Sequence, residues 1–313
     1  MQLNPIFSNS LLSACIILAM GIAFAHLKYI EKVVLESATP LEILFLGRQD
    51  CTDRSKRAKE LISRNYKSVN LPVPNREKTY FADTLLLDCG WGSVVDTIDI
   101  SNYEGANLVH DLNVPLHLGR RYDLIIDGGT LEHIYNVPIA LDNVSSLLKI
   151  GGKVIHFSPA NNHMGHGFYQ FSPELFASYY SPNNGFSDTK IFLYDPRKRN
   201  KLFGVKIQHL SSRVEIMKSG RLQIWCEATK VQDKLVKEIQ QTDYLAQWNE
   251  FAAAGKNSSK SVLKGRIALK IVSKIKKYRF TYFFALRLYQ GYRKIYWHSM
   301  SNWNPDLTTI KWK

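Results

Sequence analysis

"LLLDCGWGSV" (residues 85–94) is the stretch that decides how this chain folds, because its two glycines resemble a ligand-binding loop. A glycine loop that cradles a nucleotide follows a strand and leads into a helix whose amino end faces the ligand. Here strand-like "SVVDTIDIS" (93–101) follows Gly92 at once and leaves no room for a helix. We therefore predict a helix over 80–91, stopped at Gly90 and Gly92, where glycine tolerates a positive φ.

Outside this stretch, short apolar strands alternate with helical patterns, which predicts an α/β fold with a mostly parallel sheet. The predicted strands are 41–47, 93–101, 106–113, 122–129 and 153–159, followed by an antiparallel pair, 189–195 and 221–231. Helical patterns cover 53–66 and 137–149, and Gly151-Gly152 follows the second of them. The loop after the first strand is then "LGRQD", which begins at Gly47 on the strand.

Three of these strands lead to an aspartate, and "LLKIGGKVI" follows the fourth strand and its helix. Together with "LGRQ", "DGGTLEHIYN" and "GHGFYQFSPELF", this order resembles the class I S-adenosylmethionine-dependent methyltransferases over about residues 41–230, and in particular a group of bacterial methyltransferase-like proteins. The resemblance implies a Rossmann-like, doubly wound sheet of seven strands with an antiparallel C-terminal pair.

The resemblance also implies where S-adenosylmethionine would bind. It places Gly47 and Arg48 in the first loop, Asp99 on the ribose hydroxyls, Asp111 and Leu112 beside the adenine, and Asp127 and Gly128 beside the methionine part. A carboxylate suits two ribose hydroxyls because it accepts several hydrogen bonds. The loop departs from the family pattern, since Gly47 is its one glycine; Arg48 either contacts the cofactor carboxylate or closes the pocket.

Polar and aromatic residues after the fifth strand are the predicted acceptor side of the site. His163, His166 and Tyr169 lie in "PANNHMGHGFYQF" (159–171), and His133 comes from "TLEH". Methyl transfer requires an aligned nucleophile and removal of its proton, for which histidine is suited. The alternative is that these histidines cap loops or bond backbone carbonyls. "HMGH" with the upstream His156 matches no strong zinc spacing, so no metal site is predicted.

The charge is concentrated at the C-terminal end. Residues 1–250 contain 27 Lys and Arg against 26 Asp and Glu, whereas 251–313 contain 14 against one. Within 264–297, basic residues recur at helical spacing beside an apolar face, with aromatic rings following. This pattern favours peripheral attachment to an anionic membrane; a nucleic-acid groove and a helix packed on the body are the alternatives. We predict three parts: an apolar helical segment (1–40), the methyltransferase-like domain (41–232) and a basic helical tail (233–313).

Residues 6–25 carry no charged side chain and are just long enough to span a bilayer. Lys28 and Lys32 follow them, which would keep the body in the cytoplasm. The alternative is a buried amphipathic helix that covers the sheet, in keeping with four interrupting polar residues. Four widely spaced cysteines indicate reduced thiols rather than a disulfide framework.

These patterns lead to one main hypothesis about function, with two alternatives. The main hypothesis is a methyltransferase that uses S-adenosylmethionine on an oxygen or nitrogen of a small-molecule, glycan-linked or lipid-linked acceptor at the cytoplasmic face of a membrane. The first alternative is a non-catalytic binding or scaffold protein that has kept the fold and lost the glycine loop. The second is an RNA methyltransferase whose tail binds the RNA backbone.

Overall fold

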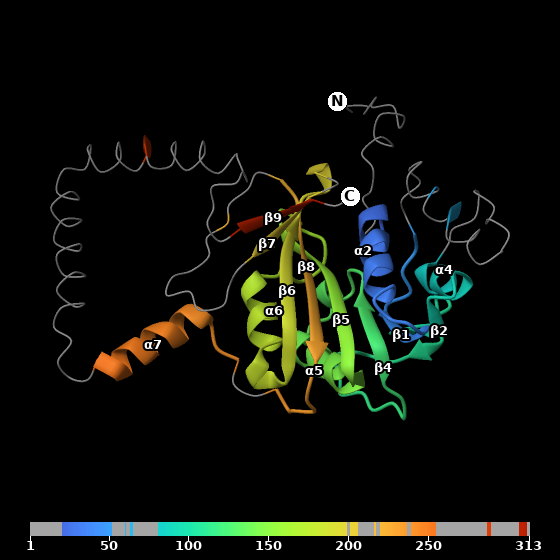
Figure 1. Cartoon of the computed structure of the whole chain (residues 1–313), viewed down its shortest axis with the longest axis horizontal. Helices are drawn as coiled ribbons and strands as arrows, with labels where there is room; N and C mark the ends of the chain where they lie inside the picture. The colour runs from blue at the N-terminus through green and yellow to red at the C-terminus, as the bar shows by residue number, and fades with distance from the viewer. Residues whose placement is uncertain are drawn as a thin grey trace, which may run out of the picture.

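The computed structural model describes a central body and separate short stretches of the chain (Figure 1). The described residues are 21–51, 60, 63–64, 81–198, 201–205, 216, 220–236, 239–254, 287–288 and 307–311. Most of the predicted helix over 53–66 lies outside them, as does nearly all of the predicted amphipathic segment 264–297.

The described body is a sheet with helices on both faces. The helices are α2 (Phe24–Val34), α4 (Ala82–Asp88), α5 (Val137–Leu147), α6 (Pro173–Tyr179) and α7 (Thr242–Ala254), with 3₁₀ turns η1 (Leu131–His133), η2 (Pro182–Asn184) and η3 (Pro196–Lys198). The strands are β1 (Leu41–Leu46), β2 (Gly92–Asp99), β3 (Leu108–Val109), β4 (Tyr122–Asp127), β5 (Leu148–Asn161), β6 (Phe186–Tyr194), β7 (Lys201–Val205), β8 (Leu222–Lys230) and β9 (Leu307–Lys311).

The sheet has the strand order β3-β2-β1-β4-β5-β8-β6-β7-β9. The first five strands are mutually parallel, and β8 inserts antiparallel between β5 and β6. This is the predicted Rossmann-like, doubly wound sheet with an antiparallel C-terminal pair. The expectation of seven strands was wrong, because β7 and β9 add two antiparallel strands beyond β6. The order reverses between β1 and β4, so the carboxyl ends of these strands form the crevice where such sheets bind ligands.

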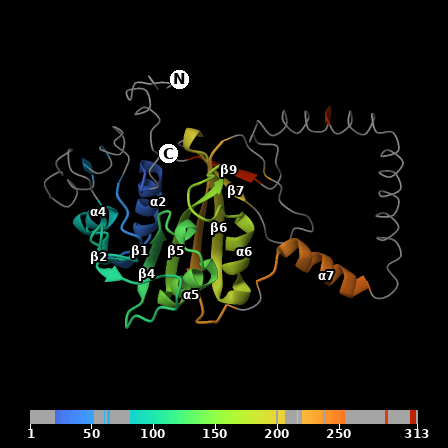
Figure 2. The same cartoon turned by 180° about the vertical axis from the view of Figure 1, so that it is seen from behind.

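Alternation along the strands sends apolar side chains to two separate cores. Leu44, Leu46 and Ile125 face a core closed by α5 and α6, while Ile43 and Phe45 face a core closed by α2 and α4. Figures 1 and 2 show these helices on either side of the sheet. The central strands are therefore buried on both faces, as their continuous apolar runs predict.

Residues 85–94 form the predicted helix end and turn, followed by a strand. Helix α4 ends at Asp88, and Gly90 has a φ of 69° just beyond the helix end. Gly92 is the first residue of β2 rather than part of the helix stop. The glycines of 85–94 therefore do not form a loop between a strand and a following helix.

Two other boundaries differ from the prediction. The third strand is reduced to Leu108–Val109, so that Asp111 lies two residues past the strand end. Strand β5 begins directly after α5 and includes Gly151 and Gly152, which were expected to separate the helix from the strand. The backbone at Gly151 has a φ of 84°, and the register of β5 against β4 shifts in this region.

The predictions for the two ends of the chain are tested in part. Most of the predicted apolar segment 6–25 lies outside the described residues, and α2 begins at Phe24, within its last two residues. In the part of the chain that the structure describes, no helix is both long and apolar enough to cross a bilayer. The tail is not helical throughout, since Leu307–Lys311 pairs with β7 as an edge strand.

Candidate functional site

The carboxyl ends of β1, β2 and β4 bring together residues from three predicted loops. Gly47 follows β1 with a φ of 68°, and its N–H donates to the Ile98 carbonyl at 2.7 Å. A Cβ at Gly47 would lie 2.6 Å from Thr130 Oγ1 and 3.8 Å from Asp99 Oδ2. Only glycine fits this crowded, left-handed position. The sequence-based expectation that Gly47 and Asp99 lie close together agrees with this geometry.

Asp99 retains capacity to bind a ligand. Its Oδ1 accepts the Ile100 N–H at 2.7 Å, and its Oδ2 has no hydrogen-bond partner among the described residues. The turn that follows is open to solvent, with Tyr103 91% exposed. This half-buried carboxylate next to an exposed turn has the chemistry that a pair of ribose hydroxyls needs.

Asp111 and Leu112 are placed differently from each other. Asp111 is exposed, and its Oδ1 accepts hydrogen bonds from the Asn113 backbone N–H at 2.9 Å and from Asn113 Nδ2 at 2.7 Å. These bonds hold the pKa of Asp111 below its usual value. Leu112 is 6% exposed and belongs to the core on the α5 face. Their assignment to an adenine site stays a prediction.

The space beside Gly47 and Gly128, where the methionine part was predicted, is filled by the protein's own side chains. Gln49 Nε2 donates to Thr130 Oγ1 at 3.1 Å, and Thr130 donates to the Leu46 carbonyl at 2.6 Å. A Cβ at Gly128 would lie 2.9 Å from Ile22 Cδ1 and 3.0 Å from Gln49 Cγ. Both glycines permit a close approach, and here the approaching groups belong to the chain itself.

Arg48 links the first loop to the elements around it. Its Nε lies 3.2 Å from Asp83 Oδ2, and its Nη1 donates to the Glu104 carbonyl at 2.8 Å and the Gly105 carbonyl at 3.2 Å. The guanidinium also stacks over the Phe81 ring at 4.1 Å. Of the two roles expected for Arg48, closing the pocket agrees better with these contacts than binding a cofactor carboxylate.

Asp127 is fully buried and fully hydrogen-bonded. Its Oδ1 accepts the N–H groups of the β4–η1 turn, with Thr130 nearest at 2.8 Å, and its Oδ2 lies 2.8 Å from His156 Nδ1. His156 Nε2 in turn lies 2.7 Å from the Tyr180 hydroxyl. Burial alone would raise the pKa of Asp127, but the bonds from His156 and the backbone hold it below its usual value. Asp127 thus organises the turn from inside and presents no free oxygen to a ligand.

Glu132, one turn further along, has the opposite environment. Its side chain is fully buried, and neither carboxyl oxygen has a hydrogen-bond partner among the described residues. Burial, together with the nearby charge of Asp127, raises the pKa of Glu132 to about 9. Sequence reasoning missed Glu132, although it lies in the quoted "TLEH" next to His133.

The predicted acceptor residues converge on Glu132. The His133 and His166 rings lie 5.2 Å apart, and the His163 ring lies 6.1 Å from that of His166. The Nε2 atoms of His163 and His166 are buried and have no hydrogen-bond partner among the described residues. Burial first, with the charges of Arg221 and His166, lowers the pKa of His163 to about 4.

Tyr169 contributes to the position of this loop. Its hydroxyl donates to the Tyr135 carbonyl at 2.8 Å, and its N–H lies 3.3 Å from the Glu132 carbonyl. The structure therefore brings His133, His163, His166 and Tyr169 together as expected, while the hydroxyl of Tyr169 is used in a loop contact. Catalytic roles for the four residues stay predictions.

S-adenosylmethionine fits one end of the predicted site and not the other. At the ribose end, Asp99 Oδ2 is available next to an exposed turn. At the methionine end, Ile22, Gln49 and Thr130 occupy the space that Gly47 and Gly128 leave. Ile22 and Gln49 lie against Gly128 in this conformation, so we expect them to move if the methionine part binds there.

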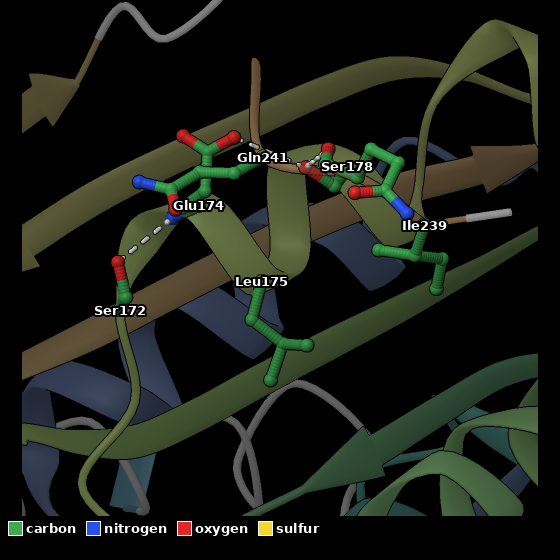
Figure 3. Close-up of a pocket in the computed structure, with 7 residues that line it drawn as sticks. Ser172, Glu174, Leu175, Ser178, Ile239 and Gln241 are labelled. Carbon is green, nitrogen blue, oxygen red and sulfur yellow. Dashed lines mark hydrogen bonds between the residues drawn. The ribbon is translucent and has the colours of Figure 1, made fainter. Parts of the chain in front are cut away.

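A separate depression of about 320 Å³ lies beside α6 (Figure 3). It is lined by Ser172, Glu174, Leu175, Ser178, Ile239, Gln240 and Gln241. Its carboxylate is already used, because Glu174 Oε1 accepts the Thr242 N–H at 2.6 Å and Oε2 accepts the Thr242 hydroxyl at 3.1 Å. These bonds fix the start of α7 to α6. We therefore interpret this depression as a structural junction outside the candidate site.

Comparison with known proteins yields structural likenesses only. No family model matches the chain, and no curated protein matches it. TehB from Haemophilus influenzae is similar at 13% identity and a TM-score of 0.32, over 66% of this chain and 62% of TehB, so the match spans less than two thirds of that protein. BH2331 of Bacillus halodurans C-125, a proposed methyltransferase, is similar at 12% identity and a TM-score of 0.35, over 65% of this chain and 99% of that one.

YcgJ from Bacillus subtilis is similar at 11% identity and a TM-score of 0.33, over 66% of this chain and all of YcgJ. Likenesses at these values assign no activity. The fold follows from the chain's own strand order, in which β8 lies antiparallel between β5 and β6. The chain thus has a Rossmann-like, doubly wound fold.

Proposed function

We propose that this protein is a methyltransferase that uses S-adenosylmethionine on an oxygen or nitrogen acceptor of a small or cell-envelope-related molecule. One observation carries the proposal: a single turn, from Asp127 to His133, places Thr130 against Gly47 and His133 against His166. The predicted cofactor loop and the predicted acceptor residues therefore share one edge of the sheet.

Within this proposal, the residues divide into two groups. Asp99 would hold the ribose hydroxyls, and the bound cofactor would supply an electrophilic methyl group. His133 is exposed, so it can take a proton from an acceptor that enters from solvent. His163 and Tyr169 would shape the acceptor side, since one is buried and the other is bonded within the loop.

A second function is supported by a different observation. Ile22 and Gln49 fill the methionine end, and Arg48 ties the loop to two other segments, residues 81–83 and residues 104–105. A closed site of this kind favours a binding or scaffold protein that has the fold without the reaction. The two functions differ in whether the cofactor binds at all.

Calorimetry with S-adenosylmethionine separates the two functions. We expect saturable heat for the full chain and at least a tenfold weaker affinity for Asp99→Asn, because a neutral amide accepts fewer hydrogen bonds from the ribose. Asp188→Asn is the matched control, since Asp188 is an exposed aspartate on β6. No heat at millimolar cofactor would support the binding protein and overturn the enzyme.

The proposal includes attachment of residues 264–297 to an anionic membrane, although these residues lie almost wholly outside the described part of the chain. Neutralising the basic face with glutamine at Arg266, Lys270, Lys274 and Lys277 should abolish flotation with vesicles that contain anionic lipid, because each basic residue contributes about 1 kcal/mol at such a surface. Unchanged flotation of this variant would remove the tail from the proposal.

A further inference from the structure

The side chain of Glu132 poses a problem that the proposed methyl transfer leaves unsolved. Both of its carboxyl oxygens are buried and lack a hydrogen-bond partner among the described residues. Leaving a buried polar group unpaired costs about 1–3 kcal/mol, so such groups are rare in native proteins. A carboxyl group in this position therefore calls for a partner other than the described residues.

The side chains around the Glu132 carboxyl group include two imidazoles, and all three side chains can bind a metal ion. Glu132 Oε1 lies 3.5 Å from His166 Nε2, and His133 offers a third nitrogen, so that one ligand atom from each residue lies within 4.8 Å of the others. Two ligands of a tetrahedral zinc ion, each at about 2.0–2.1 Å from the metal, lie roughly 3.3 Å apart. The 3.5 Å between Glu132 Oε1 and His166 Nε2 is close to that value.

The backbone holds these residues in place. The N–H groups of Phe168 and Tyr169 both donate to the Glu132 carbonyl, at 2.8 and 3.3 Å, which fixes the His166 loop against η1. Gly167 has a φ of 98°, and a Cβ there would lie 2.9 Å from the Glu132 carbonyl oxygen and 3.1 Å from His133 Nδ1. The absence of a side chain at Gly167 lets the two segments meet.

We propose that Glu132, His133 and His166 bind a divalent transition-metal ion, with Zn²⁺ the first candidate. One carboxylate and two imidazoles are ligands that zinc accepts, and three protein ligands leave a further position for water or another molecule. His133 is exposed, so that the ion can reach the buried His166 Nε2 and Glu132 oxygens from the His133 side.

The site was not predicted from the sequence, because the pattern considered there was "HMGH" (163–166) with His156, without the adjacent Glu132 and His133. His156 bonds Asp127 and Tyr180 through its two ring nitrogens and has none left for a metal. The proposal shares His133 and His166 with the acceptor side of the proposed site, and in a chain that holds the ion His133 would be a ligand rather than the base. Its test is separate, since metal binding is measured without S-adenosylmethionine. A failure of the cofactor experiment would leave it untouched.

Zinc binding to the full chain is the test, measured by competition with a chromogenic chelator and by the metal content after dialysis. We expect one Zn²⁺ per chain in the wild-type protein. Affinity should fall at least tenfold in His166→Ala and in Glu132→Gln, because each change removes or weakens one ligand. Cobalt substitution should give the visible absorption of a four-coordinate site in the wild-type protein and lose it in both variants.

His117→Ala is the matched control, since His117 is an exposed histidine that does not belong to the cluster of three ligands. It should bind zinc as the wild-type protein does. Circular dichroism checks that each variant folds, and either ligand variant alone decides the matter if the other does not fold. Absence of zinc from the wild-type protein, or equal affinity in all four proteins, would overturn the proposal.

Discussion

Asp127 and Glu132 lie five residues apart, at the two ends of one turn, and both are fully buried, yet their environments are opposite. Asp127 accepts three backbone N–H groups and bonds His156. Glu132 has no hydrogen-bond partner among the described residues and faces imidazoles. A fully paired carboxylate builds structure, whereas an unpaired one is a cost that a ligand can offset. At this edge of the sheet, Asp127 therefore stabilises the fold, whereas Glu132 is available to bind a ligand.

The largest expected effect is on stability, from Asp127→Asn. This change leaves His156 and the turn amides with a poorer partner inside the core. Each buried polar group that loses its partner costs about 1–3 kcal/mol, and several lose it here, so we expect a loss of more than about 3 kcal/mol. Glu132→Gln should change the unfolding free energy by less than about 1 kcal/mol, because no hydrogen bond is lost. Urea denaturation of the metal-free proteins measures both. Equal losses would contradict the contrast between the two acids.

Gly167→Ala should have the next largest effect. Its Cβ would meet the Glu132 carbonyl at 2.9 Å, and the left-handed backbone adds strain, so we expect a loss of about 2–3 kcal/mol. Gly165→Ala is the control, since Gly165 has a φ of 81° with nothing within 4 Å of the added atom. It should lose about 1–2 kcal/mol and keep its zinc affinity. If the two variants behave alike, the close approach at Gly167 has no special role.

Gln49→Ala tests the filled end of the cofactor site. The change removes the bond to Thr130 and the atoms that lie over Gly128. If Gln49 must move before the cofactor binds, the affinity of the variant for S-adenosylmethionine should rise several-fold. The reason is that no conformation with Gln49 over Gly128 then competes with cofactor binding. Calorimetry measures this increase. Lower affinity in the variant would show that Gln49 contacts the cofactor instead of excluding it.

The smallest expected effect concerns Glu227, a third buried acid, on the α2 face of the sheet. Burial would raise its pKa, but Lys190 at 2.8 Å and the Tyr29 hydroxyl hold it below its usual value. Its contribution to stability is therefore present above the usual glutamate pKa of about 4.3 and is lost as the pH falls through the lower folded-state value.

Glu227→Gln should accordingly cost about 1 kcal/mol near pH 7 and progressively less below pH 4, because both lysines near this carboxylate are partly exposed. Urea denaturation at several pH values measures the difference from the wild-type protein. A difference that stays constant from pH 7 to pH 3 would argue against a charged role for Glu227.

Much of the fold could be predicted because the central strands are buried on both faces and so appear as uninterrupted apolar runs. Because a strand starts at Gly92, the glycines of 85–94 could not form a ligand-binding loop before a helix. The same strand predicted that Asp99 lies at a strand end. Strands β7 and β9 could not be predicted in the same way. Each has five residues, and their partnership joins segments about a hundred residues apart, which local patterns do not reveal.

The candidate site was harder to predict, because its character depends on which polar groups are paired. The sequence places Asp127 and His133 at the edge of the sheet, but nothing local shows that backbone amides consume the Asp127 carboxylate. Burial of Glu132 results from the loop that contains Gly167, more than thirty residues later. An adjacent Glu-His pair followed by a glycine-flanked histidine was the available signal, and its meaning required the tertiary contact.

The pairing of β7 with β9 has a practical consequence for any experiment that shortens the chain. β9 covers the outer edge of β7, and an uncovered strand edge is a template for aggregation. Deleting the basic tail would remove Leu307–Lys311 together with the positive charges. A truncated protein that sedimented or adhered to vesicles would then report a bare sheet edge rather than lipid binding, and substitution of the charges avoids that confusion.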